Sequence, residues 1–333
     1  VLAGLRLDVQ NAAQDGRFRM ALHNQAGTEE EIDIRVSVIP AHYGEKTVLR
    51  LLTQPVQAFT LESLGFSGPA QELIQRALHK PYGMILATGP NGSGKTTTLY
   101  TLIKILNTPE MSMITIEDPI EYAIEDINQI PTNSKAGLTF ASGLRSILRQ
   151  DPNVIMVGEI RDEETASIAT NAALTGHILL STLHANDAPS AFTRLLDLQV
   201  PPFLIASTIN IILGQRLVRK ICAFCKTPKS LTPAELASLQ GTFSAAALNK
   251  AQSFFVGRGC EQCNSSGYEG RVGIQEVLGV SEAIRSAIMQ RANASDIKKI
   301  ALSEGMVPML EDGLTKAAQG ITTIEEILRV ARE

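Results

Sequence analysis

The chain has 333 residues, a formal net charge of −4 at pH 7 and a pI near 5.8. This length predicts two or three domains, each with its own core, and the acidic balance argues against a surface built to neutralise a phosphate backbone. A nucleic-acid motor would have to rely on a local basic patch. Trp is absent, and polar residues interrupt every apolar run well short of a bilayer span, so we expect a soluble protein.

The start of the chain, Val1-Leu2-Ala3-Gly4, has neither an initiator Met nor a leader pattern. We therefore expect upstream sequence to be missing. The four cysteines form two Cys-x-x-Cys pairs, which are typical of metal ligands in a reducing compartment, and they favour a cytoplasmic location.

Residues 1–52 contain alternating apolar and polar segments, at 32–38 and 47–52, with turn residues such as Asp15-Gly16 between them. This pattern predicts a small sheet-containing domain. Residues 53–60, which include Pro55, predict a linker short enough to couple two lobes mechanically.

From residue 61 the pattern changes to strands that alternate with helices. Strands are expected at 84–88, 112–117, 154–159 and 178–183, with helices to residue 106, near 141–150 and at 163–174. Strands separated by helix-length segments imply right-handed crossovers and a mostly parallel sheet. The sequence thus predicts an α/β domain over 61–218, a cysteine-containing module over 219–276 with a helix near 233–239, and a helical region over 277–333.

A complete phosphate-binding loop lies between the first of these strands and its helix: Gly89-Pro90-Asn91-Gly92-Ser93-Gly94-Lys95-Thr96, followed by Thr97. The glycines allow backbone N–H groups to turn toward an anion, Lys95 can reach the β- and γ-phosphates, and the Thr96 hydroxyl can bind Mg²⁺. The alternative is a glycine-rich turn that holds nothing. The flanking strand and helix favour a nucleoside triphosphate with Mg²⁺, and ATP is the triphosphate that the resemblance described below implies.

Acidic or polar residues end three later strands, where strand tips would surround the phosphates. They are Glu117 with Asp118, then Glu159, then His184. Gly158 stands where an aspartate usually supports Mg²⁺. Glu159 would therefore have to activate the nucleophilic water, support the Mg²⁺ shell, or do both. Glu117 or Asp118 could supply the second acidic group that such a site normally needs.

Each of these residues also has an ordinary structural interpretation. Glu159 could be an acid at the start of the helix that begins near Asp162, and His184 could be a buried histidine satisfied by backbone. Position at a strand tip favours a role at the γ-phosphate for both. His23, His42, His79 and His177 have no such context.

Cys222, Cys225, Cys260 and Cys263 fit a closed tetrahedral Zn²⁺ site, in which each Cys-x-x-Cys turn presents two thiolates. Redox-active dithiols are the alternative, but no thioredoxin-like context surrounds them. We therefore predict structural zinc. Arg35 and Arg50 lie on strand-like segments and are either solvated or charge donors to a phosphate, including one in a neighbouring subunit.

With these residues assigned, the chain resembles the ATPases of type II secretion and type IV pilus assembly. The likeness covers essentially the whole chain and is carried by the loop 89–96, the acidic segment 114–121, the segment 157–162 with its Gly-Glu, the histidine segment 181–187 and the four cysteines.

The resemblance implies a RecA-like P-loop NTPase domain after a truncated, PAS-like N-terminal α/β domain. It implies that Glu159 is the general base, Glu117 its acidic partner, His184 a sensor of the γ-phosphate, and Arg35 and Arg50 arginine fingers. It further implies a homo-hexamer that is cytoplasmic and peripheral at the inner membrane through a platform protein. We expect the upstream domain by which such proteins dock to be part of the missing upstream sequence.

The resulting hypothesis is a hexameric Mg²⁺-ATPase that powers pseudopilus or pilus assembly. A pilus retraction motor is the alternative within the class, and the four cysteines favour assembly or secretion. A nucleic-acid translocase and a non-catalytic nucleotide-binding scaffold are the alternatives outside it. The acidic balance disfavours the first, and phosphate release would exclude the second.

Overall fold

The computed structural model describes residues 2–23, 29–52, 59–232 and 253–331, with residues 239–240, 243–244, 247–248 and 251 between the last two ranges. The chain divides into two compact units, Val1–Ala58 and Phe59–Glu333. Most of the predicted linker, residues 53–58, and most of the predicted helix at 233–239 lie outside the described residues.

The first unit is a three-stranded antiparallel sheet in the order β1-β2-β3 (β1 Gln14–His23, β2 Glu29–Ala41, β3 Gly44–Leu52). Alternation along β2 buries Ile32, Ile34, Val36 and Val38. The predicted sheet is therefore present. The helical part of the expected α/β domain does not occur in the described part of this unit, residues 2–23 and 29–52.

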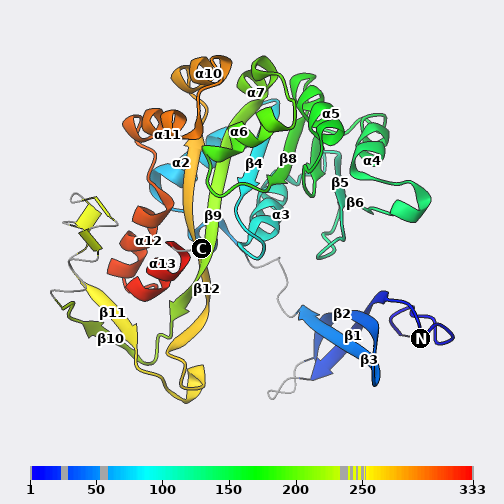
Figure 1. Cartoon of the computed structure of the whole chain (residues 1–333), viewed down its shortest axis with the longest axis horizontal. Helices are drawn as coiled ribbons and strands as arrows, with labels where there is room; N and C mark the ends of the chain where they lie inside the picture. Colours follow the sequence, from blue (N-terminus) through cyan, green and yellow to red (C-terminus); the bar gives the residue numbers. More distant parts are fainter. Residues whose placement is uncertain are drawn as a thin grey trace. The chain divides into compact units, whose positions relative to one another are not determined.

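The second unit is built around a seven-stranded sheet in the order β12-β9-β4-β8-β7-β5-β6 (Figure 1). All neighbouring strands are parallel except the edge pair β12 and β9. The strands are β4 (Gly83–Thr88), β5 (Met113–Glu117), β6 (Asn128–Pro131), β7 (Val154–Val157), β8 (Ile178–Leu183), β9 (Ile209–Ile221) and β12 (Tyr268–Gly279). The predicted parallel sheet is confirmed, and the antiparallel edge strand makes it mixed.

Helices connect the strands and pack on the sheet. They are α1 (Leu61–Leu64), α2 (Gly68–Leu78), α3 (Lys95–Leu106), η2 (Ser134–Ala136), α4 (Phe140–Ile147), α5 (Glu163–Leu174), α6 (Ser190–Asp197) and α7 (Pro202–Thr208). In α5, Ala166, Ala169, Ala172 and Ala173 are all buried. Small side chains at helical spacing bring this helix close to the sheet.

The central strands are apolar on both faces because helices cover both sides, which is why every residue of β4 and β8 is buried. β9 changes character along its length. Its pairing with β4 ends at Gly214 and its first seven residues, 209–215, are buried, whereas only Val218 and Ile221 are buried in the remaining six.

β9 and β12 continue past the rest of the sheet to the cysteine segment, which is an insertion between these two strands. That segment holds the two-stranded sheet of β10 (Lys226–Lys229) and β11 (Phe254–Gly257) and the short η3 (Glu261–Cys263). Four helices follow β12: α10 (Glu282–Met289), α11 (Ala294–Ser303), α12 (Met309–Ala318) and α13 (Ile324–Ala331). Among the described helices, none is both long and apolar enough to span a bilayer.

Candidate nucleotide-binding site

The glycine loop follows β4 and leads into α3, as predicted. Gly89, Gly92 and Gly94 have φ values of 140°, 76° and 91°, which only glycine adopts readily. A Cβ at Gly89 would lie 2.3 Å from the carbonyl oxygen of Gln215, so this position also excludes any side chain on steric grounds. Gly94 is the N-cap of α3 and offers no side-chain acceptor to the first-turn amides. Those amides and the helix dipole form an anion site.

Lys95 lies at the phosphate-binding loop, as its predicted role in binding phosphate requires. Its Nζ donates to the carbonyl oxygens of Gly89 at 2.7 Å and Pro90 at 2.9 Å. Burial lowers the pKa of Lys95, and the nearby Glu159 carboxylate raises it in part. The ammonium is therefore held at the mouth of the loop, where a phosphate oxygen would be a stronger partner than a neutral carbonyl.

Glu159 and His184 come together at the ends of β7 and β8. His184 Nε2 lies 2.9 Å from one carboxylate oxygen of Glu159, and an Arg161 nitrogen lies 2.5 Å from the other. Glu159 is 12 % exposed, whereas His184 is 45 % exposed, so the alternative of a buried histidine is wrong.

Glu159 is not the capping residue of α5, the helix whose dipole was the alternative explanation for this acid. Asp162 caps α5, because its side chain accepts from the Thr165 amide at 2.8 Å. Glu159 instead pairs with His184 and Arg161, two cations or potential cations at the strand tips.

Gly158 occupies the place where an aspartate would be usual. A Cβ here would lie 3.3 Å from the Ile116 carbonyl oxygen and 3.4 Å from the Glu117 Cα. A side chain at this position would therefore be in tight contact with β5, which small shifts of its neighbours could relieve.

Glu117 is 2 % exposed, and both of its carboxylate oxygens are engaged. Tyr100 donates to one, while Thr115 at 2.6 Å and Gln129 at 3.1 Å donate to the other. Burial and the Glu117 carboxylate raise the pKa of Tyr100, which keeps the phenol a neutral donor. The adjoining Asp118 is exposed and close enough to Arg161 to raise its pKa, although the hydrogen bond from Arg161 to Glu159 has the larger effect.

Sequence reasoning missed the partners of these acids. Arg161 follows Glu159 by two residues and lies within the motif, whereas Tyr100, Thr115 and Gln129 belong to no motif that marks them.

A further buried acid, Glu276, was also missed. It is 3 % exposed on β12, and it accepts from the amides of Ala188, just after the histidine segment, and Met309, at the start of α12.

The four cysteines form one cluster, with all four Sγ atoms within 4.8 Å of one another. The recorded Sγ–Sγ distances are 3.8 Å for Cys222–Cys260, 3.9 Å for Cys225–Cys263 and 3.7 Å for Cys260–Cys263. Four sulfurs around one Zn²⁺ at the usual bond length would be about 3.8 Å apart. The cluster therefore fits a tetrahedral zinc ion.

Hydrogen bonds within the cluster favour thiolate at Cys263. Burial raises its pKa, but the amides of Cys260 and Gly267, each 3.2 Å from the sulfur, bring the pKa down to about 6. Burial raises the pKa of Cys222 to about 11. A metal ion would hold both sulfurs as thiolates.

Arg35 and Arg50 lie in the first unit and are directly paired across β2 and β3. Arg17 of β1 pairs with Arg35 on its other side, so the three arginines form a row across one face of the sheet. We call Arg17, Arg35 and Arg50 the arginine row. Cross-strand partners point to the same side of a sheet, so the two predicted fingers are presented together.

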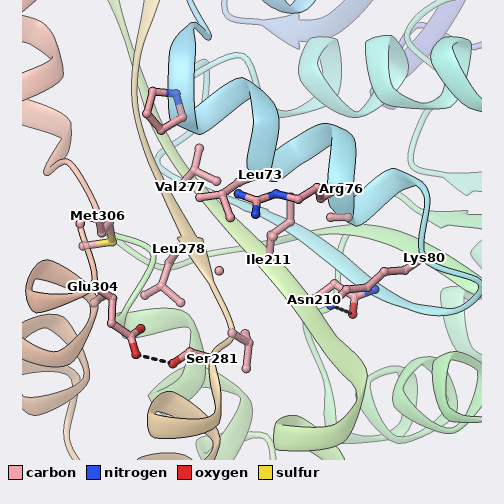
Figure 2. Close-up of a pocket in the computed structure, with 16 residues that line it drawn as sticks. Leu73, Arg76, Lys80, Asn210, Ile211, Val277, Leu278, Ser281, Glu304 and Met306 are labelled. Carbon is pink, nitrogen blue, oxygen red and sulfur yellow. Dashed lines mark hydrogen bonds between the residues drawn. The ribbon is translucent and has the colours of Figure 1, made fainter.

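A separate cavity of about 490 Å³ lies between α2, the β9–β12 pair and the end of α11 (Figure 2). Its lining is mainly apolar, with Lys80 bonded to Asn210 at 3.1 Å and Ser281 bonded to Glu304 at 2.8 Å. None of the predicted site residues lines it.

A parallel sheet whose first strand runs through a glycine loop into a helix, with acid and histidine at neighbouring strand tips, defines a P-loop nucleotide-binding fold. The profile of the family described as Type II/IV secretion system protein matches residues 5–329. The chain belongs to this family, and the resemblance seen in the sequence is confirmed.

Individual members of the family are similar to the chain over almost its whole length. The chain is 46% identical over 98% of its length to the type IV pilus assembly ATPase PilB of Thermus thermophilus, and 44% identical over its full length to type II secretion system protein E of Pectobacterium carotovorum. It spans 36% and 64% of the lengths of these two proteins.

Solved structures show the same fold. The pilus retraction motor PilT with bound ADP aligns with a TM-score of 0.68 at 27% identity, covering 97% of this chain and 78% of that one. The ATPase DotB of Legionella pneumophila aligns with a TM-score of 0.66 at 23% identity, covering 96% and 78%, which supports the fold alone.

Proposed function

We propose that the chain hydrolyses ATP with Mg²⁺ at the loop of residues 89–97. The observation that carries this proposal is the Glu159–His184 pair, 2.9 Å apart at strand tips beside the loop that holds Lys95. A loop alone would bind nucleotide, whereas cleavage also needs a carboxylate that orients and deprotonates water. The names of the relatives, PilB ATPase among them, support the same activity.

Each residue has a defined part in this proposal. The loop amides and Lys95 bind the phosphates, Thr96 holds Mg²⁺, Glu159 is the base, and His184 senses the γ-phosphate. The ion, when bound, would neutralise charge on the phosphate oxygens. Because Glu117 is fully engaged, we propose that it supports the strand tip from within and that the exposed Asp118 is the accessible second acid.

We further propose that the active form is a homo-hexamer in which Arg35 and Arg50 reach the nucleotide of a neighbouring subunit. Their pairing across β2 and β3 supports joint action on one anion. Hydrolysis would then move the first unit against the second across residues 53–60. Zinc at the four cysteines would have a structural role.

The work done would be assembly of a pilus or pseudopilus, with the chain in the cytoplasm and bound at the inner membrane to a platform protein. Relatives named for pilus assembly and for type II secretion match about equally well. The PilT structure keeps a retraction motor as the second candidate. No direct nucleic-acid partner is proposed.

The proposed activity predicts phosphate release from ATP by the purified chain in Mg²⁺ buffer, and its loss in EDTA. Loss of zinc must be separated from loss of Mg²⁺, so restoration by Mg²⁺ alone is the control. Binding of the nucleotide without phosphate release would instead identify a scaffold. Acceleration by DNA with steep salt dependence would identify a translocase.

Replacing Arg50 by Ala should lower turnover at least about tenfold while leaving ATP binding intact, because an arginine finger acts on charge that develops during cleavage. Lys46→Ala is the matched control, an exposed cation on the same face of β3. Mixing Arg50→Ala with Lys95→Ala subunits should restore part of the activity. If the two variants assemble into mixed rings and ATP turnover is still not restored, action of Arg50 on a neighbouring subunit would be contradicted.

A further inference from the structure

Gln215 lies beneath the phosphate-binding loop. β4 ends at Thr88, paired with Gly214 of β9, and the chain of β4 then turns into the loop while β9 runs straight on. The residue that follows Gly214 on β9, Gln215, therefore lies under the loop. Gln215 is 2 % exposed, so its amide must find partners inside the protein.

Both ends of that amide are bonded to the nucleotide-binding segment. Gln215 Nε2 donates to the carbonyl oxygen of Ser93 at 2.8 Å, and its Oε1 accepts from the Thr98 hydroxyl at 2.9 Å. Ser93 belongs to the loop and Thr98 to the first turns of α3. One side chain thus joins the loop to the helix that follows it.

The bond to Ser93 has a directional consequence. In a planar trans peptide the C=O of one residue and the N–H of the next point in opposite directions. Holding the Ser93 carbonyl toward β9 therefore turns the Gly94 N–H away from β9, to the outer side of the loop. Gly94, with φ 91°, can accept this orientation without strain.

We propose that Gln215 is a positioning residue for nucleotide binding, which orients the Ser93–Gly94 peptide so that its N–H faces a phosphate. This inference rests on the proposed function. The Ser93 carbonyl needs a donor and the Thr98 hydroxyl donates to an acceptor, and a glutamine amide supplies both groups at this buried position.

The test compares Gln215→Met with Gln275→Met in the full chain. Methionine keeps the volume and removes the hydrogen bonds. Gln275 is directly paired with Gln215 on β12 and is also buried, but it bonds to Leu64 and Lys316, away from the loop. Calorimetric titration with a non-hydrolysable ATP analogue and Mg²⁺ gives the affinity, and thermal melting gives the stability of each variant.

We expect Gln215→Met to weaken analogue binding about tenfold and to raise KM with kcat nearly unchanged. Gln275→Met should lower the melting temperature to a similar degree and leave affinity unchanged. Equal effects of both variants on affinity, or no effect of Gln215→Met, would overturn the inference.

If Gln215→Met fails to fold, Thr98→Val replaces it, since it removes one of the two bonds without changing shape. Weaker analogue binding with unchanged kcat would support the positioning role, and unchanged binding would refute it. A wild-type chain that binds no analogue would refute the proposed function itself, which is a separate outcome.

Discussion

Replacing Glu159 by Gln is expected to reduce ATP turnover by about 10²–10⁴-fold, because the amide keeps the shape of the side chain but cannot take a proton from water. The hydrogen bond from Arg161 can persist, so the strand tip should keep its structure. Binding of a non-hydrolysable analogue should change little. Single-turnover phosphate release and calorimetric titration measure the two quantities separately.

Glu163→Gln is the control for this change, because Glu163 is an exposed acid in the first turn of α5. It should leave turnover near the wild-type rate. The pairing with His184 adds a sharper test. If the two residues act as one unit, adding His184→Ala to Glu159→Gln should slow the reaction little further. Turnover of Glu159→Gln within twofold of wild type would remove it as the base.

The second large effect is expected at the cysteine cluster. Cys263→Ser should abolish stoichiometric zinc binding. Two backbone amides donate to the Cys263 sulfur and stabilise its thiolate, which is the form that binds zinc. Structural zinc supplies about 10–16 kcal/mol in isolated zinc-finger peptides, so losing the ion should unfold the insertion between β9 and β12. Elemental analysis and hydrogen exchange at β10 and β11 measure these effects.

Chelator treatment of the wild-type chain is the control for this variant. It should give the same exchange pattern, and added Zn²⁺ should reverse it, whereas Cys263→Ser should not respond. A wild-type chain that carries four titratable thiols and no zinc would contradict the assignment. Two disulfides formed under mild oxidation, with activity tied to them, would favour the redox alternative.

The sequence predicted those parts of the fold whose signal is local. β8 and α5 have the predicted bounds, because a mainly apolar run and an alanine-rich helical run are each flanked by turn residues. β6 was missed because Asn128–Pro131 is short, polar and at the sheet edge. The predicted boundary between the α/β domain and the cysteine module, at residue 219, lies inside β9. Nothing local in the sequence shows that one strand runs from the sheet to the cysteine segment.

The site shows the same division. The loop, Glu159, His184 and the cysteines have spacings that carry chemistry, and the structure brings Glu159 to His184 and the four sulfurs together. Gln215, Tyr100 and Glu276 were not found because each acts on residues far away in the chain. The paths of β9 and β12 bring Gln215 and Glu276 to their partners, and α3 brings Tyr100 to Glu117 of β5.

The length of β9 has a mechanical consequence. Beyond Gly214, which pairs with the last residue of β4 before the phosphate loop, β9 continues for the seven residues 215–221, about 23 Å, to the first cysteine pair. Slippage by one residue against β12 would turn the side chain of Gln215 to the other face of the sheet and break its two buried hydrogen bonds, which is costly. We therefore expect a displacement at the phosphate loop to reach the cysteine end of this strand pair as a joint tilt of β9 and β12, and not as sliding of one strand along the other.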